Sequence, residues 1–497
     1  MAEPGWEAID RHDAQRIEDL FARDAGRVAK LSLEVAGITF DWSKTHLDAE
    51  LVSRFTVIAN SQKLAERRDA LFSGGLANAT EGRSADHAAE RGTGSPEAVE
   101  LAAARRGRMR ALVDAMEGGA FGEITGVLHI GIGGSVLGPE MLVDALGRDS
   151  AVEVRFLSNI DGAAFDEAVG ALDPETTLIV AASKTFTTAE TLANLNAALA
   201  WLGEAGVDDP YGRVIAITAR PEAAVAAGID ESRILQFGEG VGGRYSLWSA
   251  VGFSAALALG WGAFEELLEG AAEMDRHFRF APPAANAPLL AAFADRFYIR
   301  QGSQTRAVFA YDERLRLLPL YLQQLEMESN GKSITLDGSP VGQPTAPVTW
   351  GGTGTDAQHA VFQLLHQGTV QVPVEFVAVA EGDDSLAPDH HRQLLLNAFA
   401  QGAALMSGRR SEHPHRDYPG DRPSATILLD RLDARSLGAL IAFYEHRTFA
   451  NAVLLGINPF DQFGVELGKE IARSLDEGGE EGAFDPSTRA LMKKAGI

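Results

Sequence analysis

The chain contains no cysteine among its 497 residues. Disulfide bonds, thiolate nucleophiles and cysteine-ligated zinc or iron–sulfur clusters are therefore excluded. The first residues, MAEPGWEAIDRHD, have neither a basic region nor an apolar core, so we do not expect them to act as a secretory signal. The expected location is the cytoplasm.

Positive charge is also scarce, because 44 lysines and arginines stand against 69 aspartates and glutamates, a net charge of -25. Such a surface repels nucleic acid and anionic lipid, so neither is expected as a partner. A small anionic substrate stays compatible with this charge, since a local pocket of amides, hydroxyls and a few cations overrides the global field.

Long hydrophobic runs are missing. The most apolar stretch, residues 248–267, is interrupted by three glycines, two serines and two glutamates. It predicts one or two buried helices rather than a membrane span. Hydrophobic residues make up 45% and charged residues 23%, which is typical of a folded globular protein. The length predicts two domains, because a single core usually stops growing well below this size.

From Gly126 onward, short β-branched runs alternate with helix-compatible sequence. The first series of expected strands is GVLHIGI, VEVRFLSN, TLIVAAS and GRVIAITA, and the second is RAVFAY, APVTW, VEFVAVA and SATILLD. Helices of the second series are expected near residues 319–329, 356–366, 391–406 and 436–450. This alternation predicts an α/β fold with two doubly wound parallel sheets.

The domain prediction divides the chain into four parts. They are a mostly helical N-terminal extension (1–95) packing on the larger domain, a smaller α/β domain (96–260), a larger α/β domain (261–455) and a C-terminal helical segment (456–497). The polar, glycine-rich sequence ERGTGSPE marks the first boundary.

The segment HIGIGGSVLGPE, from His129 to Glu140, runs from a strand through three glycines and Ser135 into a helix near Gly138. Glycine lets backbone approach a ligand closely, and a helix start offers N–H groups to an anion. The pattern is neither a Walker A loop nor a clean GxGxxG. Taken alone, it fits a tight turn as well as an anion site.

The segment ASKTFTTAET places five hydroxyl residues around Lys184 at the end of an apolar strand. Such hydroxyls cap a helix or bind phosphate oxygens. Capping needs only one of them. The glycine segment and this hydroxyl segment lie in the same expected domain, and two potential anion sites in one domain favour phosphate binding.

In GVGGRYSLWS, Arg244 follows paired glycines in apolar surroundings. A guanidinium is permanently charged and suits the stabilisation of a developing oxyanion. A structural arginine at a domain edge explains the pattern equally well.

In YLQQLEMESNGKS, Gln324 and Glu328 are four residues apart and share one face of the expected helix, which Gly331 ends. Glu328 at this rim is a candidate general base, although a surface glutamate is the commoner explanation for such spacing.

In GTGTDAQHAVFQLLHQGT, His359, Gln363 and His366 recur on one helix face, opposite a stripe of Val361, Leu364 and Leu365. The expected helix places His359 in its first turn, where the helix N-terminus disfavours an imidazolium. No HExxH or carboxylate cluster supports a metal site. A lone structural histidine is the alternative.

The last segment, FDQFGVELGKEIA, predicts an amphipathic helix with Gln462, Glu466 and Lys469 on one face. A solvated charged face explains this pattern without any function.

The six segments, in this order, resemble the phosphoglucose isomerase (glucose-6-phosphate isomerase) family. The resemblance runs from about Asp41 to Lys469, and its most specific pieces are SKTFTT, GGRYSLWS, MESNGK, QHAVFQLLHQGT and FGVELGK. It implies two sugar-isomerase (SIS) α/β domains of unequal size, in agreement with the strand and helix alternation. The activity implied is the glycolytic and gluconeogenic interconversion of glucose 6-phosphate and fructose 6-phosphate through a cis-enediol.

The resemblance also implies the roles of site residues. The sugar phosphate would be held by Gly134, Ser135, Ser183, Lys184, Thr185 and Thr188. Glu328 would transfer the proton between C1 and C2, and Arg244 would stabilise the enediolate. His359 and Lys469 would assist ring opening, while Gln324 and Gln462 would hold the substrate.

No metal or organic cofactor is implied. A homodimer is expected, because in the family the histidine reaches the active site of the neighbouring subunit.

Three positions, in two of the segments, depart from the family pattern. Val136 stands where the glycine loop usually has aspartate, and Asp356 and Ala357 stand where the histidine segment usually has Asn-Gly. A carboxylate at Asp356 would raise the basicity of His359 if the two side chains met.

Two other functions share parts of this pattern. One is a sugar-isomerase enzyme acting on mannose 6-phosphate or an amino-sugar phosphate, although amino-sugar domains lack MESNGK and FGVELGK as found here. The other is a noncatalytic sugar-phosphate sensor, which would normally carry a basic DNA-binding region that this sequence lacks.

Overall fold

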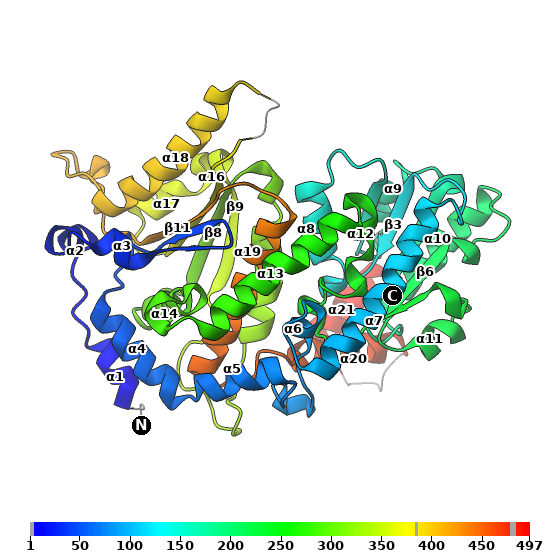
Figure 1. Ribbon diagram of the computed structural model, residues 1–497, viewed down its shortest axis with the longest axis horizontal. Coiled ribbons are helices and arrows are strands. Elements are labelled where there is room, and N and C mark those ends of the chain that lie inside the picture. The colour runs from blue at the N-terminus through cyan, green and yellow to red at the C-terminus, as the bar shows by residue number, and fades with distance from the viewer. Residues whose placement is uncertain (1–3, 383–385, 478–483) are drawn as a thin grey trace. The chain divides into compact units, whose positions relative to one another are not determined.

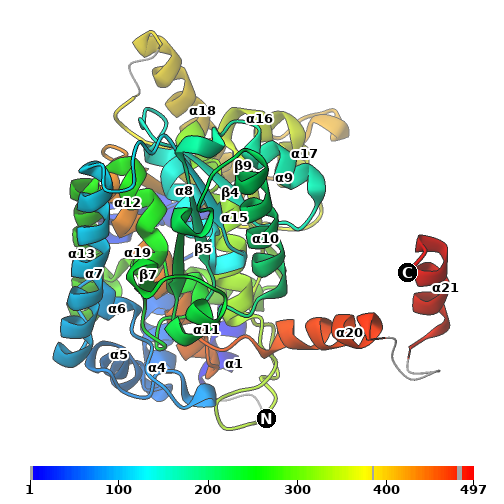
Figure 2. The same ribbon diagram turned by 90° about the vertical axis from the view of Figure 1, so that its right-hand side faces the viewer.

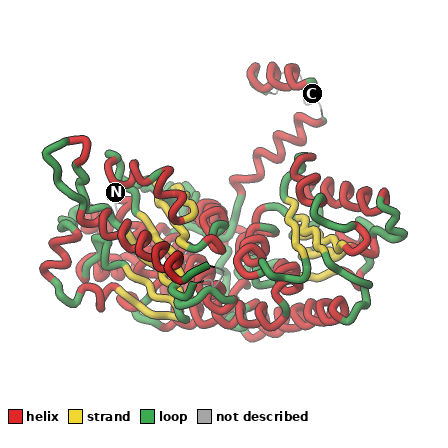
Figure 3. The backbone as a smooth tube through the Cα atoms, turned by 90° about the horizontal axis from the view of Figure 1, so that it is seen from above, coloured by secondary structure: helices red, strands yellow, loops and turns green. Residues whose placement is uncertain are grey.

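The structure, a computed structural model, describes residues 4–382, 386–477 and 484–497 (Figure 1). The chain divides into two compact units, Met1–Pro459 and Phe460–Ile497. Two separate β-sheets form the framework of the first unit, as the yellow strands in Figure 3 show. They correspond to the two series of strands expected from the sequence.

The five-stranded sheet is parallel throughout, in the order β4-β3-β5-β6-β7. Its strands are β3 (Gly126–Ile130), β4 (Glu153–Leu157), β5 (Thr177–Ala182), β6 (Val214–Thr218) and β7 (Ile234–Gln236). Strands β3, β5 and β6 are buried along their whole length, as expected for a parallel sheet covered on both faces. The sequence predicted four of these strands and missed the short edge strand β7.

Helices cover both faces of this sheet, which confirms the doubly wound arrangement (Figure 2). One face carries α9 (Gly162–Val169), α10 (Ala189–Glu204) and α11 (Pro221–Ala226), and the other carries α7 (Pro96–Glu117), α8 (Leu137–Leu146) and α12 (Phe253–Leu259). Leu128 and Ile130 of β3 pack in one apolar cluster with Leu195 and Ala198 of α10. The carboxyl ends of β3 and β5 lead into the glycine and hydroxyl segments.

The six-stranded sheet has the order β1-β2-β11-β10-β8-β9. Its strands are β1 (Ser32–Val35), β2 (Ile38–Asp41), β8 (Thr305–Tyr311), β9 (Val348–Thr353), β10 (Val374–Val379) and β11 (Ser424–Leu429). Strands β8 to β11 are parallel, as predicted, while the β1–β2 hairpin adds to β11 in antiparallel fashion. The hairpin was not predicted, because its turn residues Ala36 and Gly37 both have positive φ and alanine rarely does.

Helices also cover both faces of the six-stranded sheet. One face carries α16 (Gly354–Ala360), α17 (Phe362–Gln367) and α18 (Pro388–Ser407), and behind the other lie α13 (Trp261–Phe280), α14 (Ala287–Arg300) and α19 (Ala434–Leu455). Helix α19 is almost wholly buried, and it packs along α13 and α14. The apolar stretch 248–267 thus lies in two helices, α12 and α13, as predicted.

The remaining helices belong to the N-terminal region, to the lead-in to the proposed base, and to the second unit. They are α1 (Pro4–Asp10), α2 (Ile17–Arg23), α3 (Arg27–Leu31), α4 (Ala49–Ser61), α5 (Leu64–Ser73), α6 (His87–Glu90), α15 (Leu318–Leu322), α20 (Glu466–Asp476) and α21 (Pro486–Ala495). Across the described residues, no helix is long and apolar enough to cross a membrane.

Two expected helices differ from the structure. The helix expected over 356–366 is two short helices, α16 and α17, because the backbone at Val361 leaves the helical region with a φ of -126°. The helix expected from Phe460 begins only at Glu466, after a short 3₁₀ turn.

Candidate active site

The glycine loop follows β3 and touches two other segments that carry predicted site residues. Gly133 has a φ of 56°, in the left-handed region that favours glycine, and a Cβ there would lie 2.8 Å from Nε2 of Gln324. A Cβ at Gly134 would overlap with the backbone of Gly243 and Arg244. The loop therefore needs both glycines to approach its neighbours this closely.

His129, a buried residue of β3, fixes the far end of the glycine loop. Its Nε2 lies 2.8 Å from the carbonyl oxygen of Ser135, and its Nδ1 lies 2.8 Å from Oγ of Ser254. Because a carbonyl only accepts, Nε2 carries the proton and Nδ1 accepts from the Ser254 hydroxyl. Burial lowers the pKa of His129 to about 4, so the imidazole is neutral at pH 7. His129 thus ties Ser135 to the core.

The hydroxyl cluster follows directly after β5. Oγ of Ser183 lies 3.0 Å from Oγ1 of Thr188, and the N–H of Phe186 donates to the same serine oxygen. The hydroxyls of Thr185 and Thr187 lie 2.8 Å apart and are exposed. Thr188 occupies the N-cap position of α10, but its side chain makes no capping hydrogen bond to described residues. Capping therefore does not explain Thr188, and a helix start of this kind favours an anion.

Lys184 braces the loop that precedes Arg244. Its Nζ donates to the carbonyl oxygens of Glu239 at 2.8 Å and Val241 at 2.9 Å. Burial lowers the pKa of Lys184 to about 8. The ammonium group therefore links the hydroxyl cluster to the arginine segment and adds a positive charge between them.

Arg244 is 3% exposed and lies in a 3₁₀ turn, Gly243–Tyr245. Its Nε donates to Oγ of Ser329 at 2.6 Å, and its Nη2 donates to the carbonyl oxygen of Pro459 at 2.5 Å. Its Nη1 lies 3.5 Å from Oε1 of Glu328. Three contacts from different sides thus hold the guanidinium beside the proposed base, a geometry suited to stabilising negative charge there.

Gln324 and Glu328 lie on a π-helix, Gln323–Glu328, which continues α15. The sequence predicted an α-helix at this position. A π-helix is rare and is frequent at functional sites, and residues four apart still lie close to one face because its hydrogen bonds span five residues. The Glu328 side chain is 18% exposed. As predicted, the helical segment ends before Gly331, where a Cβ would overlap with the carbonyl of Met327.

Direct contacts therefore join four of the six segments selected from the sequence. At the carboxyl end of the five-stranded sheet lie four segments in contact: the glycine loop, the hydroxyl cluster, the arginine segment and the π-helix. They carry nine predicted site residues: Gly134, Ser135, Ser183, Lys184, Thr185, Thr188, Arg244, Gln324 and Glu328. Their individual roles stay predictions.

His359 lies outside this meeting point. It is exposed and sits in the last turn of α16, so the predicted placement in the first turn of a helix is wrong. Within the described part of the chain, His359 makes no ion pair with Asp356, so the contact considered for this carboxylate is not formed.

The apolar stripe around His359 also differs from the prediction. Leu365 is 2% exposed and packs inward together with Phe362, but Leu364 is 47% exposed. The break between α16 and α17 changes the phase of the helix and causes this difference. His366 contacts Oε1 of Gln401 through Nε2 at 2.9 Å, a structural role.

Gln462 and Lys469 belong to the second unit, Phe460–Ile497. Lys469 is exposed on α20, and Gln462 precedes the helix rather than sharing its face with Lys469, which corrects the prediction for this pair. Their roles stay predictions. At the other departure from the family pattern, Val136 is 2% exposed and packs as an apolar residue.

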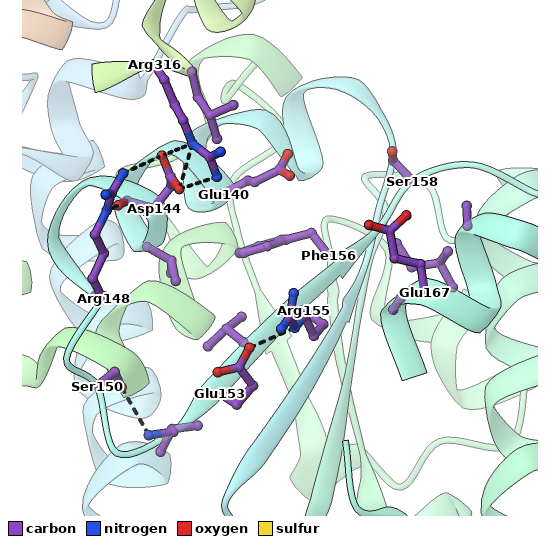
Figure 4. A pocket seen from close by; sticks show the side chains of 18 of the residues that line it. Glu140, Asp144, Arg148, Ser150, Glu153, Arg155, Phe156, Ser158, Glu167 and Arg316 are labelled. Atoms are coloured by element: carbon purple, nitrogen blue, oxygen red, sulfur yellow. Dashed lines mark hydrogen bonds and ion pairs between the residues drawn. The ribbon is translucent and has the colours of Figure 1, made fainter. Parts of the chain in front are cut away.

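A separate cavity of about 580 Å³ lies along the edge strand β4 (Figure 4). Its arginines pair with carboxylates: Arg316 donates to Asp144 at 2.7 Å, and Arg155 forms an ion pair with Glu153 at 2.7 Å. It contains none of the predicted site residues, and its cations are already neutralised. Over the described ranges, no group of three or more histidine, aspartate or glutamate side chains is arranged to hold a metal ion.

Comparison with known proteins shows to which family the chain belongs. A sequence profile described as phosphoglucose isomerase matches residues 41–492. The chain belongs to this family. A glucose-6-phosphate isomerase of Rhizorhabdus wittichii is 64% identical over 99% of both chains, and that of Zymomonas mobilis is 56% identical over 99% of this chain and 97% of the relative.

A solved structure agrees with this assignment. The crystal structure of a glucose-6-phosphate isomerase from Chlamydia trachomatis superposes with a TM-score of 0.90 at 30% identity, covering 100% of this chain and 99% of that one. The phosphoglucose isomerase fold, two α/β domains with helical extensions, is thus the fold of this chain.

Several residues around the site escaped the sequence analysis. His129 was noted only as the start of the glycine segment and Ser329 only as part of a motif, and Glu326 was not singled out. The signal for His129 was a polar residue inside an otherwise apolar strand that leads into the glycine loop. Ser329 and Glu326 gave no signal, because their partners lie far away in sequence.

Proposed function

We propose that this chain interconverts glucose 6-phosphate and fructose 6-phosphate, with Glu328 as the base that moves the proton. The observation that carries the proposal is the 3.5 Å approach of Arg244 to Glu328 where the glycine loop, hydroxyl cluster and π-helix meet. Membership of the phosphoglucose isomerase family supports the same reaction.

The phosphate group is held at the start of α8 and α10 in this proposal. Backbone N–H groups near Ser135, the hydroxyls of Ser183, Thr185 and Thr188, and the charge of Lys184 supply hydrogen bonds and positive potential. This local site overcomes the negative charge of the whole chain.

Proton transfer then proceeds on the open-chain sugar. The Glu328 carboxylate takes the proton from C2 of the aldose, the C–H electrons form the C1–C2 double bond, and the carbonyl electrons move to O1. The negative charge of this enediolate lies next to the guanidinium of Arg244. Transfer of the O2 proton to O1 lets the carbonyl form at C2, and Glu328 returns its proton to C1, which gives the ketose. Gln324 holds the sugar hydroxyls from the same helix face.

Ring opening is assigned to His359 and Lys469, with Gln462 holding the substrate. This part rests on the resemblance of their segments to the family. The exposed position of His359 on α16 supports its use by a neighbouring subunit. We therefore include a homodimer with shared active sites in the proposal.

The proposal places the reaction in the cytoplasm. A sugar phosphate carries charge and does not cross a lipid bilayer unaided, so the enzyme and its substrate share the compartment in which the substrate is made.

A coupled assay of fructose 6-phosphate conversion tests the function directly. The wild type should convert fructose 6-phosphate in the presence of a chelator. The kcat of Glu328→Gln should be lower by at least about 10²-fold, as expected for the loss of a general base. Equal turnover by both proteins, or preferred turnover of mannose 6-phosphate by the wild type, would overturn the assignment.

A further inference from the structure

Glu326 lies two residues before the proposed base on the same π-helix, but it is buried, with 5% of its surface exposed. Two residues span roughly half a turn of such a helix, so the side chains of Glu326 and Glu328 leave on opposite sides. Oε2 of Glu326 accepts from Oγ1 of Thr349 on β9 at 2.6 Å and also from the guanidinium of Arg306 on β8. Glu326 therefore fastens the back of the π-helix to the six-stranded sheet.

The partner of Glu326 is itself held in place. Nη1 of Arg306 lies 3.3 Å from Oδ1 of Asp295 on α14, and Asp295 accepts two hydrogen bonds from Arg447 on α19, at 2.5 and 2.7 Å. Burial opposes the charge of Asp295, but Arg447 and Arg306 outweigh it and hold the pKa of that carboxyl well below its usual range. These ion pairs are buried, and loss of one partner would leave an uncompensated charge in the core, so the anchor resists displacement.

The π-helix needs such an anchor more than an α-helix does. Helices of this type are rare and short, which indicates that the backbone adopts them only where surrounding contacts impose them. Here the front of the helix carries Gln324 and Glu328, and the buried back carries Glu326. The contacts of Glu326 on the buried side of the π-helix thus fix the direction in which the Glu328 side chain points.

We propose that Glu326 is a positioning residue for the isomerase reaction, holding the π-helix through Thr349 and Arg306 so that Glu328 stands against Arg244. Glu326 does not touch the substrate. The inference rests on the proposed function of the site. It adds a residue whose effect on catalysis passes entirely through the placement of Glu328.

The position of the anchor determines which kinetic constant responds. The proposed phosphate site lies on the five-stranded sheet, whereas Glu326 contacts β8 and β9 of the other sheet. Loosening the π-helix therefore misplaces the base and leaves the phosphate contacts in place, while Gln324 on the same helix loses at most a hydrogen bond to a neutral sugar hydroxyl. A displacement of about 1 Å in a reacting group lowers a rate by up to about 10²-fold.

Two variants weaken the anchor by different amounts. Glu326→Gln removes the charge but keeps the shape, and Thr349→Val removes one hydroxyl without changing the volume. Thr93→Val is the matched control, because Oγ1 of Thr93 also donates to a buried carboxylate, that of Asp275, at 2.5 Å, in a network that does not include the π-helix.

For each variant we would measure kcat and KM for fructose 6-phosphate, the pH profile of kcat, the melting temperature, and the dissociation constant of glucitol 6-phosphate. That compound carries the phosphate but no carbonyl, so it reports binding without chemistry. Glu326→Gln should lower kcat by about 10- to 100-fold and shift the pH profile, while KM and the dissociation constant of glucitol 6-phosphate change by less than kcat and by no more than about tenfold.

Thr349→Val should lower kcat in the same direction by a smaller factor, and Thr93→Val should lower the melting temperature alone. The inference is overturned if Glu326→Gln folds and keeps wild-type kcat and pH profile. Should Glu326→Gln fail to fold, an unchanged kcat in Thr349→Val overturns it instead. Failure of the wild type to isomerise fructose 6-phosphate would overturn the proposed function, a result distinct from either of these.

Discussion

Nη1 of Arg244 lies 3.5 Å from Oε1 of Glu328, across 84 residues of sequence and between the two sheets of the first unit. The guanidinium is fixed by Ser329 and by the carbonyl of Pro459, so it needs no rearrangement when charge develops on the substrate. Electrostatic preorganisation of this kind is the physical basis of the proposed mechanism.

The first prediction concerns the guanidinium. Arg244→Lys keeps the charge but cannot reproduce the three contacts of the planar group, so kcat should fall by about 10²- to 10³-fold, as for a lost oxyanion donor. Steady-state kinetics with fructose 6-phosphate would measure it. A lysine variant with more than half of the wild-type kcat would show that Arg244 serves the structure alone.

The second prediction concerns the hydroxyl cluster. Thr188→Val should raise KM for fructose 6-phosphate by about 10- to 100-fold, because it removes a hydrogen bond to a charged group worth about 1.5–3 kcal/mol. Thr191→Val is the control, since its Oγ1 is buried and has no hydrogen-bond partner among the described residues. A larger effect at Thr191 than at Thr188 would place the phosphate elsewhere.

The third prediction follows from Lys184, whose pKa burial lowers to about 8. The free enzyme carries this charge below pH 8 and loses it above, so KM for fructose 6-phosphate should rise as the pH passes 8. KM values measured from pH 6.5 to 9.5 would show the rise in the wild type. Lys184→Met should have a higher KM at pH 7 and lack this rise. A parallel rise in both proteins would assign it to another group.

The fourth prediction concerns stability. Burial raises the pKa of Glu90 to about 7. Between pH 4.5 and 7 the folded protein thus binds a proton that the unfolded chain has released, and the free energy of unfolding falls as the pH rises. Glu90→Gln does not lose stability in this way, so its free energy of unfolding relative to wild type should increase by about 2.5 kcal/mol between pH 5 and pH 8 in urea titrations. A pH-independent difference would contradict the assignment.

The fifth prediction concerns the proposed shared site. Glu328→Gln and His359→Ala should each be nearly inactive, and mixing the two under conditions that exchange subunits should restore part of the activity. The restored activity arises in the hybrid site that has both an intact glutamate and an intact histidine. No recovery, despite hybrid dimers proven by mass spectrometry, would count against donation of His359 by the neighbour.

Much of the fold could be predicted from local pattern. All eight expected strands exist, because an apolar β-branched run buried on both faces leaves a clear signal. The β1–β2 hairpin escaped because Ala36 adopts a positive φ that its sequence does not suggest. The break at Val361 escaped because apolar spacing on both sides continues as if one helix were present.

The site could be predicted only as separate segments. The residue spacing predicted which helix face carries Glu328 but not which residue it contacts. Its role came from the family resemblance. Neither the spacing nor the resemblance indicated a π-helix, because residues four apart lie close to one face in an α-helix and in a π-helix alike. The contacts of Arg244 with Ser329 and of Glu326 with Thr349 join distant segments, and only the folded chain brings them together.

The central claim is that Glu328 moves a proton between two carbons of the substrate. Incubation of glucose 6-phosphate in D₂O, followed by NMR, tests it most directly. The wild type should place solvent deuterium at C2 of glucose 6-phosphate and at C1 of fructose 6-phosphate, and Glu328→Gln should do neither at measurable rate while still binding glucitol 6-phosphate. Deuterium incorporation by Glu328→Gln at the wild-type rate would contradict the account.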